Sequence, residues 1–413
     1  MHLQFELAGD WRIRVTGAET DVTLDVPPPA VVAVRDEAYC RLPIYRPEQA
    51  GYSRGERLLG VRAGDLTAPG HLVPDTFHLK PFPGRPDTFT IKTDYDLDPQ
   101  WATFGRLAEG AIGKRQTVWA DYDCVPPRID AVVRDAAGQL RLRQGRIAAG
   151  VPLLTKPAAG ETLLGRVWLS GPMPRLEETH LFPVRQTAPP AALPPTAEQL
   201  LPRTLAKLRR GEPVTYVAWG DSVTFGCDLA WPGAGYPHRF ARTLAGRFPN
   251  AAIAVHSAAW PGYTSRLYMD APAGGEYDFK RDVLDVKPDL VSIEFVNDAA
   301  YDEPTLRGLY AEILERLRGN GAEVIFITPH LVRPDWMNGT PAPAGADPRL
   351  YVRTLQAVAA EHCVAVADAA RYWRALRDQG IPYMVYEANS INHPDERAQE
   401  FFVQALLDCF PPA

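Results

Sequence analysis

The sequence predicts two domains of different class: a β-rich domain over residues 1–182 and an α/β domain with a mostly parallel sheet over residues 196–413. Short alternating apolar and polar runs dominate the first part, whereas apolar runs alternate with helical patterns in the second. A proline-rich stretch separates the two parts. At 413 residues, the chain is also too long for one ordinary core.

The first part contains short β patterns separated by Gly, Asp and Pro turns. Trp11–Val15 and Thr88–Thr93 alternate in this way, and Ile129–Arg134 and Leu140–Arg143 flank a turn and form a predicted hairpin. Many short strands favour a sandwich, jelly-roll or barrel-like domain. Residues 43–86 are irregular and rich in Pro and Gly, and no element is predicted there.

The boundary between the domains lies in residues 183–195, which contain five prolines and therefore favour an extended, stiff connector. Thr196 and the three residues after it have the form of a capping box, which predicts a helix from there to about Arg210.

The second part alternates strands with helices. The predicted strands are Val214–Trp219, Ala252–His256, Leu290–Phe295, Val324–Thr328 and Val364–Ala367. The predicted helices are Pro237–Phe248, Phe279–Val286, Pro304–Arg318, Arg349–Glu361 and Glu396–Cys409. Such alternation indicates βαβ units and a three-layer arrangement with helices on both faces of the sheet.

The first of these strands ends at Gly220-Asp221-Ser222, a turn that carries an acid and a hydroxyl. Open α/β sheets place their chemistry at the carboxyl ends of strands. We therefore expect the Ser222 hydroxyl to be exposed as a nucleophile, with its backbone N–H available to an oxyanion. Read alone, the tripeptide is also compatible with a helix-capping turn.

The segment Gly-Asp-Ser-Val-Thr resembles the first sequence block of the SGNH (GDSL-type) hydrolases. Three further blocks follow in the family's order, and the resemblance covers roughly residues 212–411. The resemblance implies a flavodoxin-like three-layer fold and a serine esterase. It also implies that Gly262 and Asn297 join Ser222 in the oxyanion hole, and that His393 is the base. Asp298 is read as a residue that shapes its loop. The second block departs from the family pattern, with Ser257 in place of Asn.

A further departure lies before His393. The family has Asp three residues earlier, where this chain has Ser390. Three interpretations follow: a backbone carbonyl near Asn389 or Ser390 holds the ring, Glu387 reaches it, or the site is degenerate. We favour the first, a Ser–His dyad.

Other residues are candidates for substrate contact. Asp221 adjoins the nucleophile, and His330 follows the strand that begins at Val324. The long loop that follows contains Trp336 and is a candidate lid. Trp260 and Tyr263 belong to the second block, and flat aromatic rings suit the C–H faces of sugars. Each aromatic ring could instead pack on its own loop.

Composition excludes several classes of protein. The net charge is only −6 and basic residues are scattered, so we expect neither a nucleic-acid nor a membrane partner. The five cysteines are widely spaced, which argues against a disulfide framework or a zinc site. No Walker A, GxGxxG or HExxH motif occurs, and we expect no metal or cofactor. As given, the N-terminus predicts a cytoplasmic protein, or a secreted or periplasmic one if a leader was removed.

The sequence therefore predicts a two-domain esterase that removes short acyl groups, with acetyl on a small-molecule or polysaccharide carbohydrate preferred. The alternatives are a lipase- or phospholipase-like esterase and a non-catalytic carbohydrate-binding protein on a degenerate scaffold. The oligomeric state is not predicted.

Overall fold

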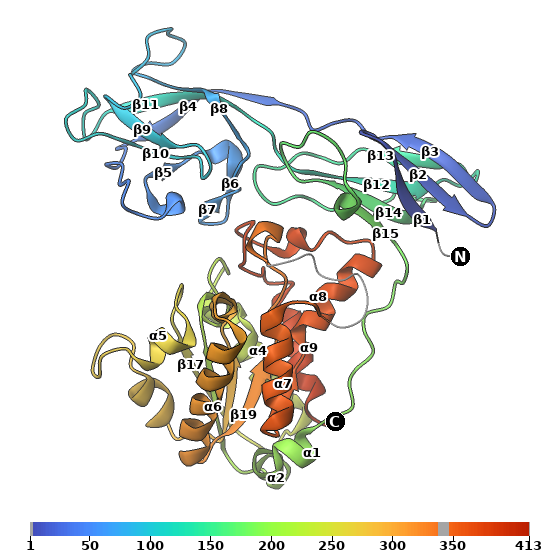
Figure 1. Ribbon diagram of the computed structural model, residues 1–413, viewed down its shortest axis with the longest axis vertical. Coiled ribbons are helices and arrows are strands. Elements are labelled where there is room, and N and C mark those ends of the chain that lie inside the picture. The colour runs from blue at the N-terminus through green and yellow to red at the C-terminus, as the bar shows by residue number, and fades with distance from the viewer. Residues whose placement is uncertain (1–2, 338–346, 413) are drawn as a thin grey trace. The chain divides into compact units, whose positions relative to one another are not determined.

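The computed structural model describes residues 3–337 and 347–412. The chain forms two compact units (Figure 1). Residues 1–187 and 377–391 make up the first, termed the N-terminal unit. Residues 188–376 and 392–413 make up the second, termed the α/β unit. The segment 377–391 thus belongs with residues far earlier in the chain.

The N-terminal unit is built from antiparallel sheets, which confirms the predicted β-rich class. One sheet has the order β1-β2-β3 and a second has the order β13-β12-β14-β15. Their strands are β1 Gln4–Gly9, β2 Arg12–Gly17, β3 Thr20–Asp25, β12 Arg128–Arg134, β13 Leu140–Arg143, β14 Thr162–Leu169 and β15 Leu181–Pro183. Ile13 and Val15 of β2 share a core with Val132 and Val167, so the two sheets pack face to face. The predicted hairpin forms β12 and β13.

The described part of the unit has three further sheets, and a second core joins the two that contain Phe77 and Phe104. Their orders are β4-β11-β8, β5-β10-β9 and β6-β7. The strands are β4 Val32–Cys40, β5 Glu56–Arg57, β6 Arg62–Ala63, β7 Leu66–Thr67, β8 Leu72–Lys80, β9 Tyr95–Asp98, β10 Thr103–Arg106 and β11 Thr117–Cys124. Buried residues alternate with partly exposed ones along β11, as expected for a strand with one face on a core.

Two predictions in this region differ from the structure. The predicted strand Thr88–Thr93 is wrong: Ile91 makes only an isolated bridge, and the Asp94 carboxylate accepts a hydrogen bond from the Thr90 N–H in a tight turn. Strands β5 to β8 all lie within the stretch 43–86, where none was predicted. Strand β8 contains Pro74, and its pairing with β11 shifts register between Asp121 and Asp123.

The α/β unit contains a parallel sheet with the order β17-β16-β18-β19-β20. The strands are β16 Val214–Gly220, β17 Ile253–Ala259, β18 Leu290–Glu294, β19 Glu323–Ile327 and β20 Ala365–Ala367. In sequence order this is 2-1-3-4-5, the flavodoxin-like arrangement, so the predicted fold class is confirmed.

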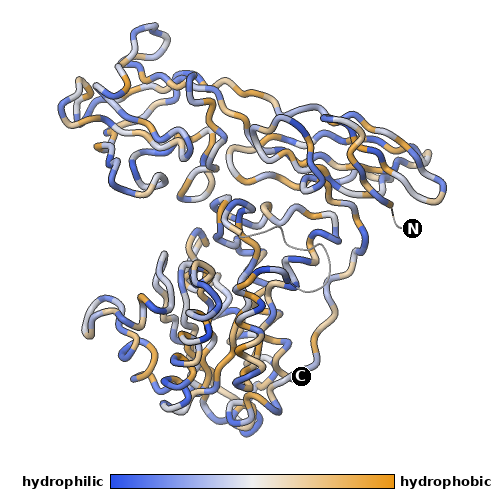
Figure 2. Tube along the Cα trace, in the orientation of Figure 1, coloured by the Kyte–Doolittle hydropathy of each residue, from blue (hydrophilic) through white to orange (hydrophobic). Residues whose placement is uncertain are grey.

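Helices cover both faces of this sheet. Figure 2 shows hydrophobic residues along the strands and recurring along the helices of this unit. Helices α4 Tyr236–Arg247 and α9 Gln399–Asp408 pack together on one face, and α6 Glu303–Gly319 and α7 Leu350–Glu361 pack on the other. Val217 and Trp219 of β16 point to the α6 side, whereas Tyr216 meets Phe240 of α4 edge-on, with ring centroids 5.3 Å apart.

The remaining helices are short or were predicted differently. They are α1 Ala197–Leu200, α2 Pro202–Arg210, α3 Ser222–Phe225, α5 Ser265–Met269 and α8 Ala369–Asp378. The helix predicted from Thr196 to Arg210 is divided before Pro202. The predicted capping box is absent, because Thr196 has near-helical backbone angles and its side chain makes no cap hydrogen bond.

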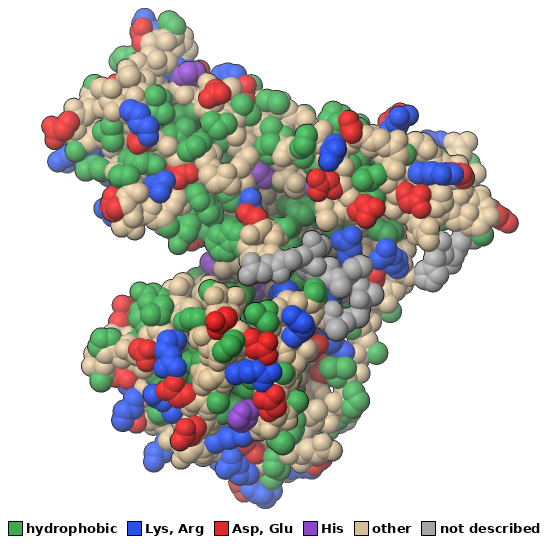
Figure 3. Space-filling view, viewed as in Figure 1, with side chains coloured by type: hydrophobic (Ala, Val, Ile, Leu, Met, Phe, Trp, Pro, Cys, Tyr) green, Lys and Arg blue, Asp and Glu red, His purple; other side chains and the backbone are tan. Residues whose placement is uncertain are grey.

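The sequence predicts scattered charges and no disulfide framework, and the structure agrees on both points (Figure 3). Figure 3 shows acidic and basic side chains interspersed on the visible face of each unit. All five cysteines are free thiols. Within the described residues, no helix combines the length and apolar character that crossing a membrane requires.

Candidate functional site

Three predicted site segments leave the sheet at one edge. Gly220, at the end of β16, is in register with Ala259 of β17 and Glu294 of β18. Because the three strands are parallel, the segments that carry Ser222, Gly262 and Asn297 begin side by side.

The turn at Ser222 is held by both neighbouring strands. The Asp221 N–H donates to the Glu294 carbonyl at 3.2 Å, and the Gly220 carbonyl accepts from the Trp260 N–H at 3.0 Å. A Cβ at Gly220 would lie 2.0 Å from Thr224 Oγ1, so only glycine fits. Ser222 is the first residue of α3, and only 4% of the residue is exposed. Accessibility of its hydroxyl to a substrate remains a prediction.

Asp221 is a support for this turn and has no access to substrate, which corrects the expectation of substrate contact. Its side chain is fully buried, and its carboxyl accepts hydrogen bonds from the N–H groups of Val223 at 3.1 Å and Asn297 at 3.2 Å. Burial raises the pKa of Asp221 to about 7. Its role is to tie the Ser222 turn to the Asn297 loop.

The two other predicted oxyanion donors have suitable local geometry. Gly262 is exposed and has φ +80°, a conformation that favours glycine. The side-chain amide of Asn297 donates one hydrogen bond to the Tyr263 carbonyl at 3.2 Å. That bond fixes the amide plane, and the second amide hydrogen has no partner among the described residues.

Two buried carboxyl groups, those of Asp298 and Glu294, form hydrogen bonds beneath the surface next to Asn297. Asp298 accepts from the Ser265 N–H at 2.9 Å, the Ser265 hydroxyl at 2.6 Å and the Tyr310 hydroxyl at 2.9 Å. Burial outweighs these donors and raises the pKa of Asp298 to about 6. Glu294 accepts from the Thr224 hydroxyl at 3.2 Å, and burial raises its pKa as well. Both residues are buried and hold loops.

His393 is bonded to an aspartate that the sequence analysis missed. Its Nδ1 lies 2.6 Å from Asp228 Oδ2, six residues after Ser222. Asp228 has φ +62°, so its side chain leaves the turn after α3 in an uncommon direction. The two residues are 165 positions apart, and only the fold could reveal the pair.

The three residues considered for orienting His393 lie in the N-terminal unit. Ser390 donates its hydroxyl to the Gly150 carbonyl at 2.9 Å, and the Asn389 side chain accepts from the Ile391 N–H at 3.0 Å. Glu387 is fully buried. Asp228 therefore supplies the contact that these residues were expected to supply.

His330 is buried, which corrects the expectation of substrate contact. It is fully enclosed, and its Nε2 lies 2.8 Å from the Asn392 carbonyl. Burial lowers the pKa of His330 to about 3, so the ring is neutral. Its contact is with the residue before His393.

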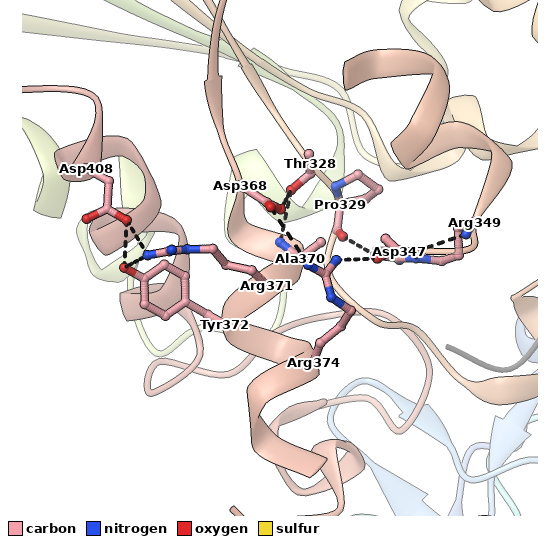
Figure 4. A network of polar contacts seen from close by, with 10 residues as sticks. All are labelled: Thr328, Pro329, Asp347, Arg349, Asp368, Ala370, Arg371, Tyr372, Arg374 and Asp408. Carbon is pink, nitrogen blue, oxygen red and sulfur yellow. Dashed lines mark hydrogen bonds and ion pairs between the residues drawn. The ribbon is translucent and has the colours of Figure 1, made fainter. Parts of the chain in front are cut away.

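A polar network braces the backbone at the end of β19 (Figure 4). Arg349 donates to the Pro329 carbonyl at 2.8 Å and to the His330 carbonyl. Asp347 is buried and binds both Arg349 at 2.8 Å and Arg374 at 2.9 Å. Nearby, the Thr328 hydroxyl donates to Asp368 and accepts from the Ala370 N–H. The Asp408 carboxylate accepts from Arg371 and from the Tyr372 hydroxyl.

The aromatic candidates differ in the surface that they offer. Trp260 lies between Tyr263 and Tyr277, with stacked centroids 3.4 and 4.2 Å away, so both of its faces are covered. Tyr263, next to Gly262, is partly exposed. Trp336 is 47% exposed at the start of the predicted lid, of which residues 338–346 lie outside the described residues.

Residues 218–401 match the model of the GDSL-like Lipase/Acylhydrolase family. This region is a GDSL-like hydrolase domain. The match confirms the resemblance drawn from the four sequence blocks. No curated protein sequence gave a significant match to the chain.

Several solved structures resemble about half of this chain at low identity. A two-domain esterase active on acetylated mannans has 18% identity and a TM-score of 0.40, and the match covers 50% of each chain. An acetylxylan esterase from Geobacillus stearothermophilus, solved as a catalytic mutant, has 22% identity and a TM-score of 0.36 over 48% of this chain and 95% of that chain. A GDSL-family lipolytic protein from Veillonella parvula has 17% identity and a TM-score of 0.33 over 48% and 97%. The chain therefore spans about half the length of the first of these.

Proposed function

We propose that this protein is a serine esterase in which Ser222 is the nucleophile, His393 the general base and Asp228 the residue that orients the base. The observation that carries the proposal is the 2.6 Å contact between His393 Nδ1 and Asp228 Oδ2. A carboxylate accepts the Nδ1–H, so the lone pair of the neutral ring lies on Nε2, where it can accept a proton.

The proposed reaction has two halves. His393 Nε2 takes the Ser222 proton as Oγ bonds to the ester carbonyl carbon, and then returns it to the departing alcohol as the ester bond breaks. Water, deprotonated by the same ring, then cleaves the acyl-enzyme and restores Ser222. The N–H groups of Ser222 and Gly262 and the Asn297 amide would stabilise each oxyanion.

The experiment compares hydrolysis of 4-nitrophenyl acetate and butyrate by wild type, Ser222→Ala and His393→Ala. We expect both variants to lose activity, with acetate preferred by the wild type. His256→Ala, at an exposed position of β17, is the histidine control. A wild type no faster than its Ser222 variant would overturn the proposal.

We further propose that the acyl group is acetyl and is carried by a carbohydrate. Support comes from Tyr263, whose ring is partly exposed beside Gly262 and is held flat on Trp260. A rigid aromatic face suits the apolar face of a sugar, and preorganisation lowers the entropic cost of binding.

This proposal predicts a substrate-dependent effect of Tyr263→Ala. KM for an acetylated mannan or xylan oligosaccharide should rise about tenfold, which corresponds to about 1.4 kcal/mol of lost binding free energy. Kinetics with 4-nitrophenyl acetate should change little, because that substrate has no sugar. Release of acetate from no acetylated sugar, together with fast hydrolysis of long-chain esters, would favour a lipase instead.

A further inference from the structure

We propose that His330 is a positioning residue for His393: its imidazole N–H holds the Asn392 carbonyl and thereby fixes the loop that presents the general base. The inference rests on the proposed function for the role of His393, but the contact itself does not. His330 comes from the end of β19, far from His393 in sequence.

The contact is directional. Nε2 of His330 lies 2.8 Å from the Asn392 carbonyl oxygen, and a carbonyl can only accept. The proton of the neutral ring is therefore on Nε2. Nδ1 is buried and has no hydrogen-bond partner among the described residues. Hydrophobic packing alone would be served better by an apolar side chain, so the N–H bond to Asn392 explains why a histidine is useful here.

The ring has little freedom to move. It packs against Trp373 and Phe402, with centroids 5.4 and 5.9 Å away. Its own backbone carbonyl accepts from the Arg349 guanidinium. Asp347 holds that guanidinium in turn (Figure 4). The donor is thus held in place through both its side chain, by residues of α8 and α9, and its main chain, by the residue before α7.

The other side of His393 is held in a similar way. The Gln399 side chain donates to the Pro394 carbonyl at 3.3 Å and accepts from the Tyr236 N–H at 2.9 Å. The residues before and after His393 therefore both have carbonyls bound by buried side chains. This arrangement leaves the His393 ring to be oriented by Asp228.

The test compares three variants with wild type. His330→Leu removes the donor, His330→Asn keeps a polar group that is too short to reach Asn392, and His330→Gln carries an amide N–H that can reach it. We expect kcat to fall about 10- to 100-fold in the first two variants with KM nearly unchanged, as when partners that orient histidines are removed, and to recover largely in His330→Gln. Thr354→Val removes another buried polar group, from α7, and should leave kcat unchanged.

A double-mutant cycle separates positioning from general damage. In a His393→Ala background, His330→Asn should cause no further loss of 4-nitrophenyl acetate hydrolysis, because the base that it positions is gone. An equal loss in both backgrounds would overturn the proposal. Because the cycle uses His330→Asn, it can be carried out even if His330→Leu fails to fold.

A spectroscopic measurement tests the contact without activity. The Nδ1 proton of His393, bonded to Asp228, should give a far-downfield proton resonance in wild type and His330→Gln that broadens or disappears in His330→Asn. An unchanged resonance would overturn the proposal. If wild type shows no serine-dependent hydrolysis, the proposed function fails, and this resonance still decides the role of His330.

Discussion

Asp228 is the residue on which the chemistry of His393 depends most directly. Replacement by asparagine keeps the shape but not the charge, and leaves the imidazolium that forms during catalysis without its partner. We expect Asp228→Asn to reduce kcat by about 10⁴-fold, the size of this effect in other serine hydrolases. Steady-state kinetics with 4-nitrophenyl acetate measures it.

Glu387→Gln is the matched control, since Glu387 is also acidic and was the other carboxylate considered from the sequence. It should retain most of the wild-type kcat, because the carboxylate bonded to His393 is Asp228. A loss in Glu387→Gln as severe as that in His393→Ala, with Asp228→Asn nearly active, would reverse this assignment.

Asp298 predicts a pH dependence of stability. Burial raises its pKa from an ordinary 3.8 to about 6. Between these values the native state keeps a proton that the unfolded chain has released. Its contribution to stability is therefore fully present at low pH and is lost as pH rises through this window, by on the order of 3 kcal/mol.

Asp298→Asn cannot titrate and is the reference. The melting temperature of wild type minus that of the variant should fall between about pH 4 and 6 and stay constant above pH 7. A difference that rises with pH would mean that the three donors around Asp298 outweigh its burial and keep it ionised.

At the scale of elements, the α/β region was predicted well because its physical signals are local. Short, largely apolar runs such as Leu290–Glu294 are typical of buried strands, and they alternate with amphipathic helical patterns. Helix α8 was missed, although its buried residues follow a helical spacing from Ala369 through Tyr372 and Trp373 to Leu376.

The strands of the N-terminal unit were predicted less well, because bulges and turns interrupt the alternation that identifies a strand. Strand β8 accommodates Pro74 because its pairing with β11 is interrupted there: Val73 pairs with Asp123 and His78 with Asp121, and Pro74 lies between the two pairs. Asp228 could not be predicted as a site residue for another reason: its partner is distant in sequence, and Asp after a short helix has no special pattern.

The junction of β16 and α3 gives a prediction about Gly220. A Cβ there would meet Thr224 Oγ1 at 2.0 Å and the Glu294 carbonyl at 2.3 Å, and β18 cannot retreat without losing its pairing with β16. We expect Gly220→Ala to destabilise the fold by about 1–3 kcal/mol through overpacking, measured by urea denaturation.

Gly246→Ala is the control for this substitution. Gly246 is exposed in α4, with no atom within 4 Å of an added Cβ, so alanine should stabilise the protein by up to about 1 kcal/mol. Equal stability of the two variants would contradict this prediction, because it would show that Thr224 and β18 can move to accommodate a Cβ at position 220 without a measurable cost in free energy.

At the scale of the whole molecule, the units do not follow the order of the chain. The chain enters the N-terminal unit for a second time at Arg377 and leaves it after Ile391. Within this unit, Arg166 of β14 donates to the Gly380 carbonyl at 2.7 Å, and the N–H groups of Arg185 and Gln186 donate to the Asp378 carbonyl. The segment that leads to His393 is therefore ordered by residues of the β-rich unit.

This organisation predicts that a substitution in β14 impairs catalysis from a distance. Arg166→Leu in the full chain should speed amide hydrogen exchange in residues 377–391 and lower kcat several-fold, because the loop before His393 loses a buried hydrogen bond. Arg143→Leu breaks the exposed ion pair with Glu161 in the same unit and should change neither quantity. If exchange in this segment rises in Arg166→Leu while kcat stays at the wild-type level, the β-rich unit orders the segment without affecting the base, and the order of residues 392–394 comes from the α/β unit alone.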